Sequence, residues 1–363
     1  MGSIHDYSTI RGDRYLVRYK KPDRTHAARR GFRTPADARA YLDVIDTSIA
    51  HGRYVDPKHA LVTVGELATG WLEFQTAVLK PSSAHSLDSA WRVHVAPRWA
   101  DTILNDITHS DVREWVARLT ATHGASTVIR AQGVLSGILD VAVRDHRLTD
   151  NPARGIRLPR KTPAPRAYLT HIQVADLARQ ARHPELVYVL AYTGLRWGEA
   201  TGLRVRDVDT GRRRLHVQEN AVTVNGTIYV GTPKTHRARS IPYPKFLGPF
   251  IDTAIGDKPP ADLVFGDGRE HLRPPSSQSG WFAAAVRRSQ AQDPGFPRVT
   301  PHDLRHTAAA LAIRAGANVK VVQRMLGHAS ATMTLDTYAH LFEDDLDTVA
   351  GALHNAAVAD GPN

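Results

Sequence analysis

Cysteine is absent from this sequence of 363 residues. Disulfide bonds and thiolate metal sites are therefore excluded, and the composition suits a reducing compartment. No apolar run reaches the roughly 18 residues that a membrane-spanning helix needs. The first thirty residues are polar and charged, so we also expect no signal peptide. These absences predict a cytoplasmic protein with no membrane partner.

Acidic residues are outnumbered by basic ones. The sequence has 36 Asp and Glu against 47 Lys and Arg, a net charge of +11, and 38 of the basic residues are arginine. Guanidinium groups bind phosphate through two hydrogen bonds at once, so this balance favours a nucleic-acid partner. A GC-rich genome would produce the same arginine bias, and composition alone leaves both explanations open.

Residues 1–60 are predicted to form a small basic unit, with twelve Lys and Arg against seven acidic residues. Apolar and polar residues alternate over 13–20, which indicates a strand, and 27–34 is typical of a second strand after a turn. Thr34 and Asp37 then form a predicted capping box at the start of a helix that ends near Gly52. So small a unit usually docks on a partner, here DNA.

Residues 61–160 are predicted to be helical. Four segments, 63–79, 82–100, 110–124 and 126–148, carry apolar residues at helical spacing and begin at or near Ser or Thr. Basic residues gather at the end of this region, over 144–166, together with several prolines. That composition predicts an interdomain linker, which either follows a phosphate backbone or is simply solvated.

Residues 161–363 make the largest predicted domain. Helical segments come first, and a strand-rich stretch over 212–244 contains Asn225-Gly226, a strong hairpin signal. Helical segments then continue to the end of the chain. The predicted fold class is mainly α with a small antiparallel sheet (α+β), in three domains: 1–60, 61–160 and 161–363.

The segment TPHDLRH raises the question of a metal site, because His302 and His306 would lie on one helix face, as in some zinc sites. Thr300 and Asp303, however, predict the start of a helix by a capping box. Helix N-termini favour anions over cations, and Arg305 would repel a metal ion. The segment therefore favours phosphate over zinc, although a surface helix with incidental His and Arg has the same pattern.

Two further segments carry residues that could act in chemistry. Gly194 is predicted to end a helix just before Arg196, and Glu199 lies on the same helical face as that arginine. Gly327 is predicted to be a helix C-cap, which would leave His328 exposed at a helix end. Taken singly, neither pattern indicates a functional site, because Arg–Glu pairs are common as structural salt bridges and glycine is common at helix ends.

Taken together and in this order, these segments resemble the active site of the tyrosine recombinases, the phage integrase family. TGLRWGE is similar to the family's first arginine box, HDLRHT to its His-x-x-Arg box, and LGHASATMTLDTY to its closing box. The resemblance extends in layout over about 61–345. It implies six catalytic residues: Arg196, Lys234, His302, Arg305, His328 and Tyr338.

The resemblance also implies a mechanism without a metal or any other cofactor. Arg196 and Arg305 would neutralise a phosphodiester and its transition state, as a metal does in other phosphoryl-transfer enzymes. Tyr338 would attack the phosphorus and leave a 3′-phosphotyrosine and a free 5′-hydroxyl. Lys234 would protonate that leaving oxygen.

The remaining residues of the predicted site have supporting roles. His302 would assist proton transfer from the tyrosine, and His328 would bind a non-bridging oxygen. Glu199 would orient its neighbouring arginine, and His306 would pack against or support other residues.

The family implies double-stranded DNA as the partner and a bacterial host. Residues 61–160 resemble a core-binding (SAM-like) domain that closes with the catalytic domain around the duplex, and residues 1–60 resemble a three-stranded arm-binding domain. A homotetramer on DNA, a DNA-bending host factor and an excisionase follow from the same resemblance. Two alternatives are a type IB-like topoisomerase, which needs no synapsis, and a non-catalytic architectural DNA-binding protein.

The end of the chain is predicted to form one amphipathic helix over 340–358, with an apolar stripe that must be covered. Folding back onto its own domain is one way to cover the stripe. The family implies the other, in which the helix packs on a neighbouring subunit.

Overall fold

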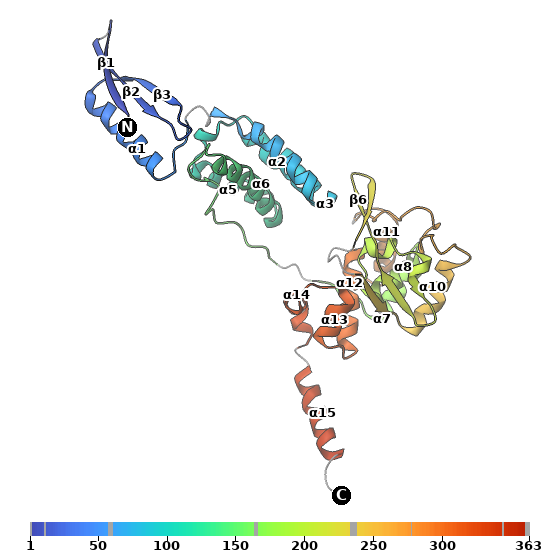
Figure 1. Ribbon diagram of the computed structural model, residues 1–363. Coiled ribbons are helices and arrows are strands. Elements are labelled where there is room, and N and C mark those ends of the chain that lie inside the picture. The colour runs from blue at the N-terminus through green and yellow to red at the C-terminus, as the bar shows by residue number, and fades with distance from the viewer. Residues whose placement is uncertain are drawn as a thin grey trace. The chain divides into compact units, whose positions relative to one another are not determined.

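The computed structural model describes residues 2–10, 12–56, 61–162, 166–232, 238–276, 278–342 and 345–359. The chain divides into two compact units, Met1–Thr162 and Pro163–Asn363 (Figure 1). The described residues are mainly helical with small antiparallel sheets, which confirms the predicted fold class.

The first unit begins with a three-stranded antiparallel sheet of order β1-β2-β3, followed by one helix. Its elements are β1 (Ser3–Thr9), β2 (Gly12–Lys20), β3 (His26–Phe32) and α1 (Pro35–Ala50). The capping box pattern predicted the start of α1, where the Thr34 hydroxyl accepts a hydrogen bond from the Asp37 backbone at 3.1 Å. The alternation of apolar and polar residues predicted only two strands, because β1 has few apolar residues, whereas the family resemblance implied three. A small core forms between β2 and α1, around Val17 and Leu42.

The rest of the first unit is helical, as predicted. Its elements are α2 (Val64–Val78), α3 (Pro81–Ala90), a π-helical turn η2 (Trp91–Val95), α4 (Ala96–Trp99), a 3-10 turn η3 (Leu104–Asp106), α5 (His109–Thr122) and α6 (Ala125–Arg144). α3, η2 and α4 follow one another without a break in helical backbone, so the single helix expected over 82–100 is present and contains a π-helical turn. The helices enclose their own core, in which Trp99 and Trp115 meet edge to face with ring centroids 5.9 Å apart.

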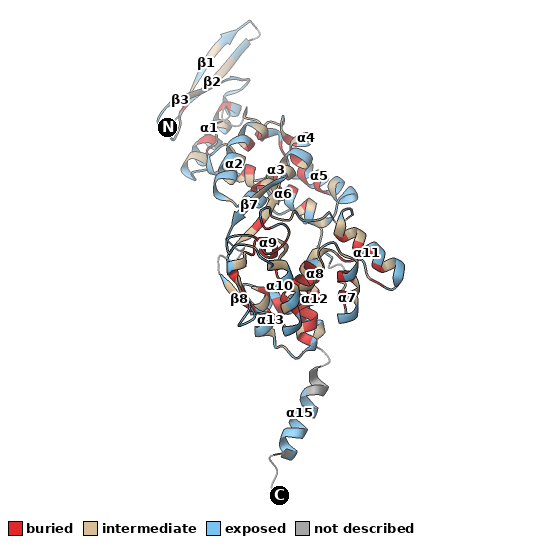
Figure 2. Cartoon of the chain, turned by 90° about the vertical axis from the view of Figure 1, so that its right-hand side faces the viewer, coloured by how far each residue is buried: buried red, intermediate tan, exposed pale blue. Residues whose placement is uncertain are grey.

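α6 is the one helix in the described ranges that is long and apolar enough to cross a membrane. Its residues Val134, Leu135, Ile138 and Leu139 are fully buried in the core of the helical region, as the red band along α6 in Figure 2 shows. α6 is therefore the central helix of a folded core.

The stretch predicted as a linker is in part a packed segment. The Asn151 side-chain amide donates to the Ser136 carbonyl at 2.9 Å and to the Asp140 carboxylate at 2.6 Å, and Ala153 is fully buried. Ile156 also packs against the helical core. The prediction of a free linker beginning at residue 144 is therefore wrong for its first half, because these polar and apolar contacts hold it against α6.

The second unit is built around α8, which packs against α7 and α12. Its helices are α7 (His171–Gln180), α8 (Pro184–Thr193), α9 (Trp197–Thr201), α10 (Gly248–Ile255), α11 (Trp281–Gln292), α12 (Pro301–Arg314), α13 (Val319–Leu326), α14 (Ala331–Tyr338) and α15 (Asp345–Ala359), with 3-10 turns η4 (Val205–Asp207), η5 (Lys245–Leu247) and η6 (Ala339–Leu341). α8 is almost entirely apolar, and both it and much of α12 are buried (Figure 2).

Two small sheets lie in the strand-rich stretch of this unit. One has the order β4-β5-β8 and the other pairs β6 with β7. Their strands are β4 (Val208–Asp209), β5 (Arg214–Val217), β6 (Asn220–Val224), β7 (Thr227–Gly231) and β8 (Arg239–Pro242). Asn225 and Gly226 connect β6 to β7 with φ angles of 49° and 78°, as a type I′ turn requires, which confirms the predicted hairpin.

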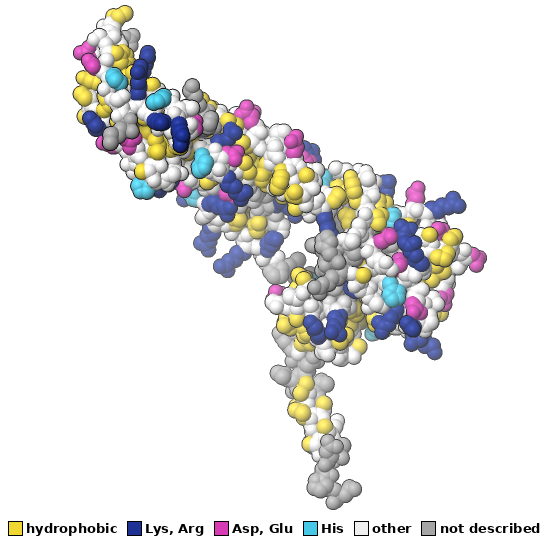
Figure 3. All heavy atoms as spheres, in the orientation of Figure 1, with side chains coloured by type: hydrophobic (Ala, Val, Ile, Leu, Met, Phe, Trp, Pro, Cys, Tyr) yellow, Lys and Arg dark blue, Asp and Glu magenta, His cyan; other side chains and the backbone are white. Residues whose placement is uncertain are grey.

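The C-terminal stripe predicted on one helix is divided between two elements. Leu341 and Phe342 pack on a small core with α12, α13 and Tyr338, whereas α15 begins only at Asp345. On α15, Val349, Leu353 and Val358 are exposed, and Figure 3 shows hydrophobic side chains along that helix. The expectation of one continuous helix from residue 340 is therefore wrong.

Candidate active site

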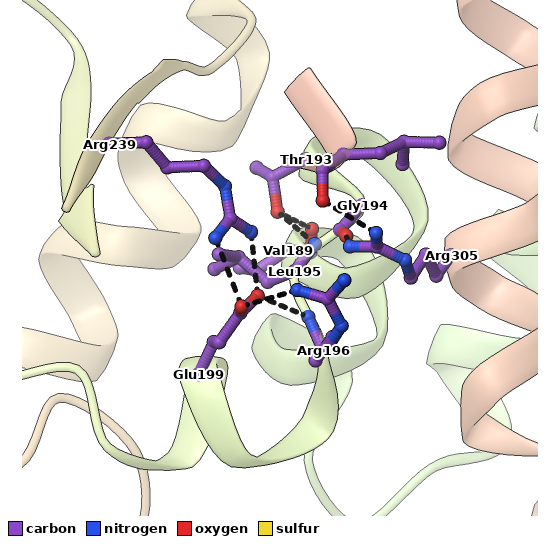
Figure 4. Close-up of polar contacts among 9 residues, drawn as sticks. Val189, Thr193, Gly194, Leu195, Arg196, Glu199, Arg239 and Arg305 are labelled. Atoms are coloured by element: carbon purple, nitrogen blue, oxygen red, sulfur yellow. Dashed lines mark hydrogen bonds and ion pairs between the residues drawn. The ribbon is translucent and has the colours of Figure 1, made fainter. Parts of the chain in front are cut away.

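The site is organised around Glu199, which is buried at 1% exposure. α8 ends at Gly194, in the left-handed conformation (φ 66°), so that Arg196 becomes the N-cap of α9 and Glu199 follows on its first turn. The Glu199 carboxylate accepts hydrogen bonds from the Arg196 backbone at 2.9 Å and from its guanidinium at 2.8 Å (Figure 4). The predicted helix break and the predicted Arg–Glu pair are both confirmed.

A second arginine, which lies outside the motifs of the sequence, holds the same carboxylate. Arg239, at the start of β8, donates from Nη1 to Oε1 of Glu199 at 3.0 Å and from Nη2 to Oε2 at 2.6 Å (Figure 4). Its Nε is buried and has no hydrogen-bond partner among the described residues. A Cβ atom added to Gly327 would lie 3.0 Å from this Nε. Arg239 therefore fills the space that a glycine at the end of α13 leaves open.

Arg305 lies on the first turns of α12, where Thr300 and Asp303 form the predicted capping box. The Asp303 carboxylate accepts from the Thr300 backbone and hydroxyl, both at 2.7 Å. The Arg305 side chain is buried and donates to the backbone carbonyls of Gly194 and Leu326. These carbonyls belong to the C-terminal ends of α8 and α13, whose partial negative charge favours a cation. The guanidinium is thus fixed by backbone from two helices.

The charges at this site do not cancel. Burial disfavours the Glu199 carboxylate, but its hydrogen bonds and ion pairs with Arg239 and Arg196 lower its pKa to about 2. Burial and the neighbouring charge of Arg196 lower the pKa of Arg305 to about 9, which still leaves it charged at neutral pH. Three guanidinium groups therefore surround a single carboxylate, and the excess positive charge suits an anion with several acceptor oxygens.

His302 and His328 both lie close enough to this arginine cluster for the charges of Arg196 and Arg305 to act on their rings. His302 is exposed on the first turn of α12. His328 follows the C-cap glycine of α13, and its Nδ1 lies 2.9 Å from the Thr334 hydroxyl. The prediction that His328 is exposed is wrong, because α14 folds back over it. Burial and the charge of Arg305 lower the pKa of His328 to about 4, so it is neutral at pH 7.

Tyr338 is the last residue of α14 and is 1% exposed. Burial raises the pKa of its phenol to about 12. Its ring is parallel to that of His328 with centroids 6.5 Å apart. Arg166 donates to the Thr337 carbonyl at 3.2 Å and so ties the end of α14 to the segment before α7.

The histidine that contacts the tyrosine is His306, whose Nδ1 lies 2.7 Å from the Tyr338 hydroxyl. The sequence predicted His306 to have a packing or supporting role and assigned proton transfer to His302. In the structure the His302 ring instead meets the His306 ring edge to face, with centroids 5.0 Å apart. The four-residue spacing of His302 and His306, which raised the question of a metal site, was the sequence signal that these two rings would meet on successive turns of α12.

Five of the six predicted catalytic residues lie in this one region of the second unit, and Lys234 lies outside the described residues. Arg239 was missed because only strand periodicity marks it. Two residues before the buried Ile241, it shares that residue's face of β8. The arrangement offers guanidinium groups for phosphate oxygens, neutral imidazoles for proton transfer and a phenol as nucleophile.

Known proteins are similar to this chain in sequence and in fold. Residues 168–344 match the family model described as the phage integrase family. The chain is 30% identical over 346 residues to the prophage phiRv2 integrase of Mycobacterium tuberculosis, covering 90% of this chain and 88% of that one. The fold is similar to that of the Tn1549 transposon integrase in complex with transposon right-end DNA (TM-score 0.68, 23% identity, 81% of this chain and 100% of that one). It is also similar to the lambda integrase tetramer bound to a Holliday junction (TM-score 0.57, 18% identity, 90% and 96%).

The charge on Glu199 predicts an acid-dependent loss of stability. Because folding lowers the pKa of this carboxyl from 4.5 to about 2, its contribution is complete above pH 4.5 and is lost as the pH falls toward 2. The size of that contribution is about 3 kcal/mol. Glu199→Gln should remove it, which urea unfolding between pH 7 and pH 2.5 would measure.

The matched control is Glu114→Gln, which breaks the exposed pair between Glu114 and Arg118. It should change the free energy of unfolding by less than about 1 kcal/mol at any pH. Wild type and Glu199→Gln losing stability in parallel over this range would contradict the assignment.

Proposed function

Because this chain belongs to the phage integrase family, we propose that its arginine–tyrosine site cleaves and rejoins DNA to integrate and excise a mobile element. The chain is a tyrosine-type site-specific recombinase that acts on DNA. The observation that carries the assignment of its site is the excess of positive charge around Glu199. Three guanidinium groups and one carboxylate leave an excess of positive charge and of N–H donors. A phosphodiester supplies the negative charge and the acceptor oxygens that match this excess.

In this proposal Arg196 and Arg305 bind the non-bridging oxygens of the scissile phosphate. Both are held before DNA arrives, Arg196 by Glu199 and Arg305 by two backbone carbonyls. Electrostatic groups that are already in place need no reorganisation as charge develops in the transition state. Neutral His328 adds a hydrogen bond to a non-bridging oxygen.

Tyr338 is the proposed nucleophile. Its phenolic O–H bond breaks, its oxygen forms a bond to phosphorus, and the bond from phosphorus to the 5′-oxygen breaks. Lys234 supplies a proton to that leaving oxygen, and His302 assists the transfer of the phenolic proton away from the tyrosine. The product is a 3′-phosphotyrosine, whose ester is attacked by another 5′-hydroxyl when strands are exchanged.

Removal of the phenolic hydroxyl tests this chemistry. Tyr338→Phe should bind core-site DNA within about threefold of wild type, since it keeps the buried ring, and should form no SDS-stable adduct on a nicked suicide substrate from the element's ends. Tyr229→Phe, which changes an exposed tyrosine on β7, should form the adduct normally. EDTA should leave the wild-type reaction intact. An adduct on Tyr338→Phe, or its loss in EDTA, would refute the mechanism.

The N-terminal region, residues 1–60, is proposed to bind a second class of DNA site, the arm-type sites. Its support is a net charge of +5 on a unit with its own small core between β2 and α1. Arginine and lysine side chains are visible on its surface in Figure 3. Such charge is the usual mark of a phosphate-binding surface.

A chain that begins at Leu61 should therefore cleave core sites but lose protection of a separate sequence in the element's ends. Footprints of the full chain and the shortened chain on the same DNA measure this. Footprints that coincide would show that this region binds no second site.

Assembly into a homotetramer on DNA is proposed through α15. Val349, Leu353 and Val358 are exposed on this helix, and an exposed apolar stripe at a chain end favours burial against a partner. The partner we propose is the neighbouring subunit of the same chain. A DNA-bending host factor and an excisionase are further predictions from the family.

Truncation after Asp345 tests this assembly. Binding to one core site and the thermal midpoint of the free monomer should change little, because the removed side chains of residues 349–358 are exposed. Synapsis and strand exchange should fall by at least tenfold, measured by gel shift and by product formation. A shortened chain that is insoluble or melts many degrees lower would place α15 in its own domain's core.

A further inference from the structure

The hydrogen bond between His306 and Tyr338 has no role in the mechanism proposed above. It joins Nδ1 of His306 to the phenolic oxygen at 2.7 Å, from α12 to the end of α14. The phenol can donate only if Nδ1 carries no proton, which requires the neutral ring with its proton on Nε2. The geometry therefore has the donor and acceptor of a proton transfer already in contact.

The surroundings of His306 keep its imidazole neutral. Burial, followed by the charges of the groups around it, lowers its pKa to about 4. The titratable and charged groups that face the His306–Tyr338 pair are His302, Asp303, Arg305, Arg166, Tyr168 and His328. Of these groups only Asp303 favours a protonated His306, and its carboxylate is already bonded to Thr300.

We propose that His306 is the catalytic residue that accepts the phenolic proton of Tyr338 during strand cleavage. This inference rests on the proposed function, because it takes Tyr338 as the nucleophile. As the phenolic oxygen bonds to phosphorus, its O–H bond breaks and the proton passes to Nδ1 of His306. The bond from phosphorus to the 5′-oxygen breaks, and the leaving oxygen takes its proton from Lys234, the acid of the proposed function. In religation the imidazolium returns its proton to the tyrosine.

A purely structural His306 would also contact Tyr338, so the experiment must separate holding the ring from accepting its proton. His306→Asn provides this separation, because its amide reaches the same region and forms hydrogen bonds but does not take up a proton. The chain offers a matched control in His171 of α7, whose Nδ1 lies 2.7 Å from the hydroxyl of Tyr192 on α8. His171→Asn removes the same kind of contact away from the site.

The first measurement needs no DNA. Long-range proton–nitrogen NMR of the full chain should show His306 as the neutral Nε2–H form, with an Nδ1 signal that shifts in Tyr338→Phe and not in Tyr192→Phe. A protonated His306, or an Nδ1 signal unaffected by Tyr338→Phe, would overturn the proposal whatever reaction the protein performs.

The second measurement is single-turnover cleavage of the nicked suicide substrate from the element's ends. His306→Asn and His306→Ala should each be slower by at least about 100-fold, as loss of a proton acceptor predicts, and His171→Asn should stay within about threefold of wild type.

Replacing Tyr338 by difluorotyrosine lowers the pKa of the phenol, so the defect of both His306 variants should shrink to below about tenfold. A defect unchanged by fluorination, or a His306 variant that cleaves as fast as wild type, would overturn the proposal. Failure of the wild-type chain to form any adduct would instead refute the proposed function.

Discussion

The Glu199 carboxylate is the interaction on which the site depends. It accepts from the backbone and side chain of Arg196 and from both terminal nitrogens of Arg239. A buried carboxylate with this many charged donors stays ionised well below its ordinary pKa, and it fixes the positions of both arginines. Because it is one negative charge among three guanidinium groups, it orders the cluster without neutralising it. The charge that is left over is available to a phosphate.

The fold supplies the rest of the site from the ends of its helices. α8 and α13 both end in left-handed glycines, Gly194 and Gly327. The carbonyls at these two ends bind Arg305, and the Cβ-free surface of Gly327 receives Arg239. A side chain at either glycine would strain the backbone and move a neighbouring group. The glycines of the recombinase-like motifs are thus structural conditions for the placement of the arginines.

Helix ends and local pairs were predictable from the sequence because they depend on neighbouring residues. The capping box at Thr300, the break at Gly194 and the pairing of Arg196 with Glu199 all follow from spacings of a few residues. The order of three such segments also predicted the family. Residues that meet through the tertiary fold were not predictable in this way. Arg239 lies 40 residues from its partner Glu199, and nothing in the sequence next to it indicates that contact.

Burial was the other property that local patterns could not supply. His328 was expected to be exposed after a helix end, yet the return of α14 covers it. The same packing carries Tyr338 into the core, where its hydroxyl meets His306 from α12 instead of His302. The first half of the expected linker is held against α6 by hydrogen bonds of the Asn151 side chain to Ser136 and Asp140. Composition alone does not indicate these partners.

If the arginine cluster neutralises a phosphodiester, DNA with an uncharged phosphate at the scissile position should no longer need Arg196. On ordinary DNA, Arg196→Ala should cleave slower than wild type by roughly 100-fold or more. On DNA with a methylphosphonate at the scissile position, which lacks that negative charge, Arg196→Ala should recover to within about tenfold of wild type. An Arg196→Ala variant that is equally impaired on both substrates would contradict this account.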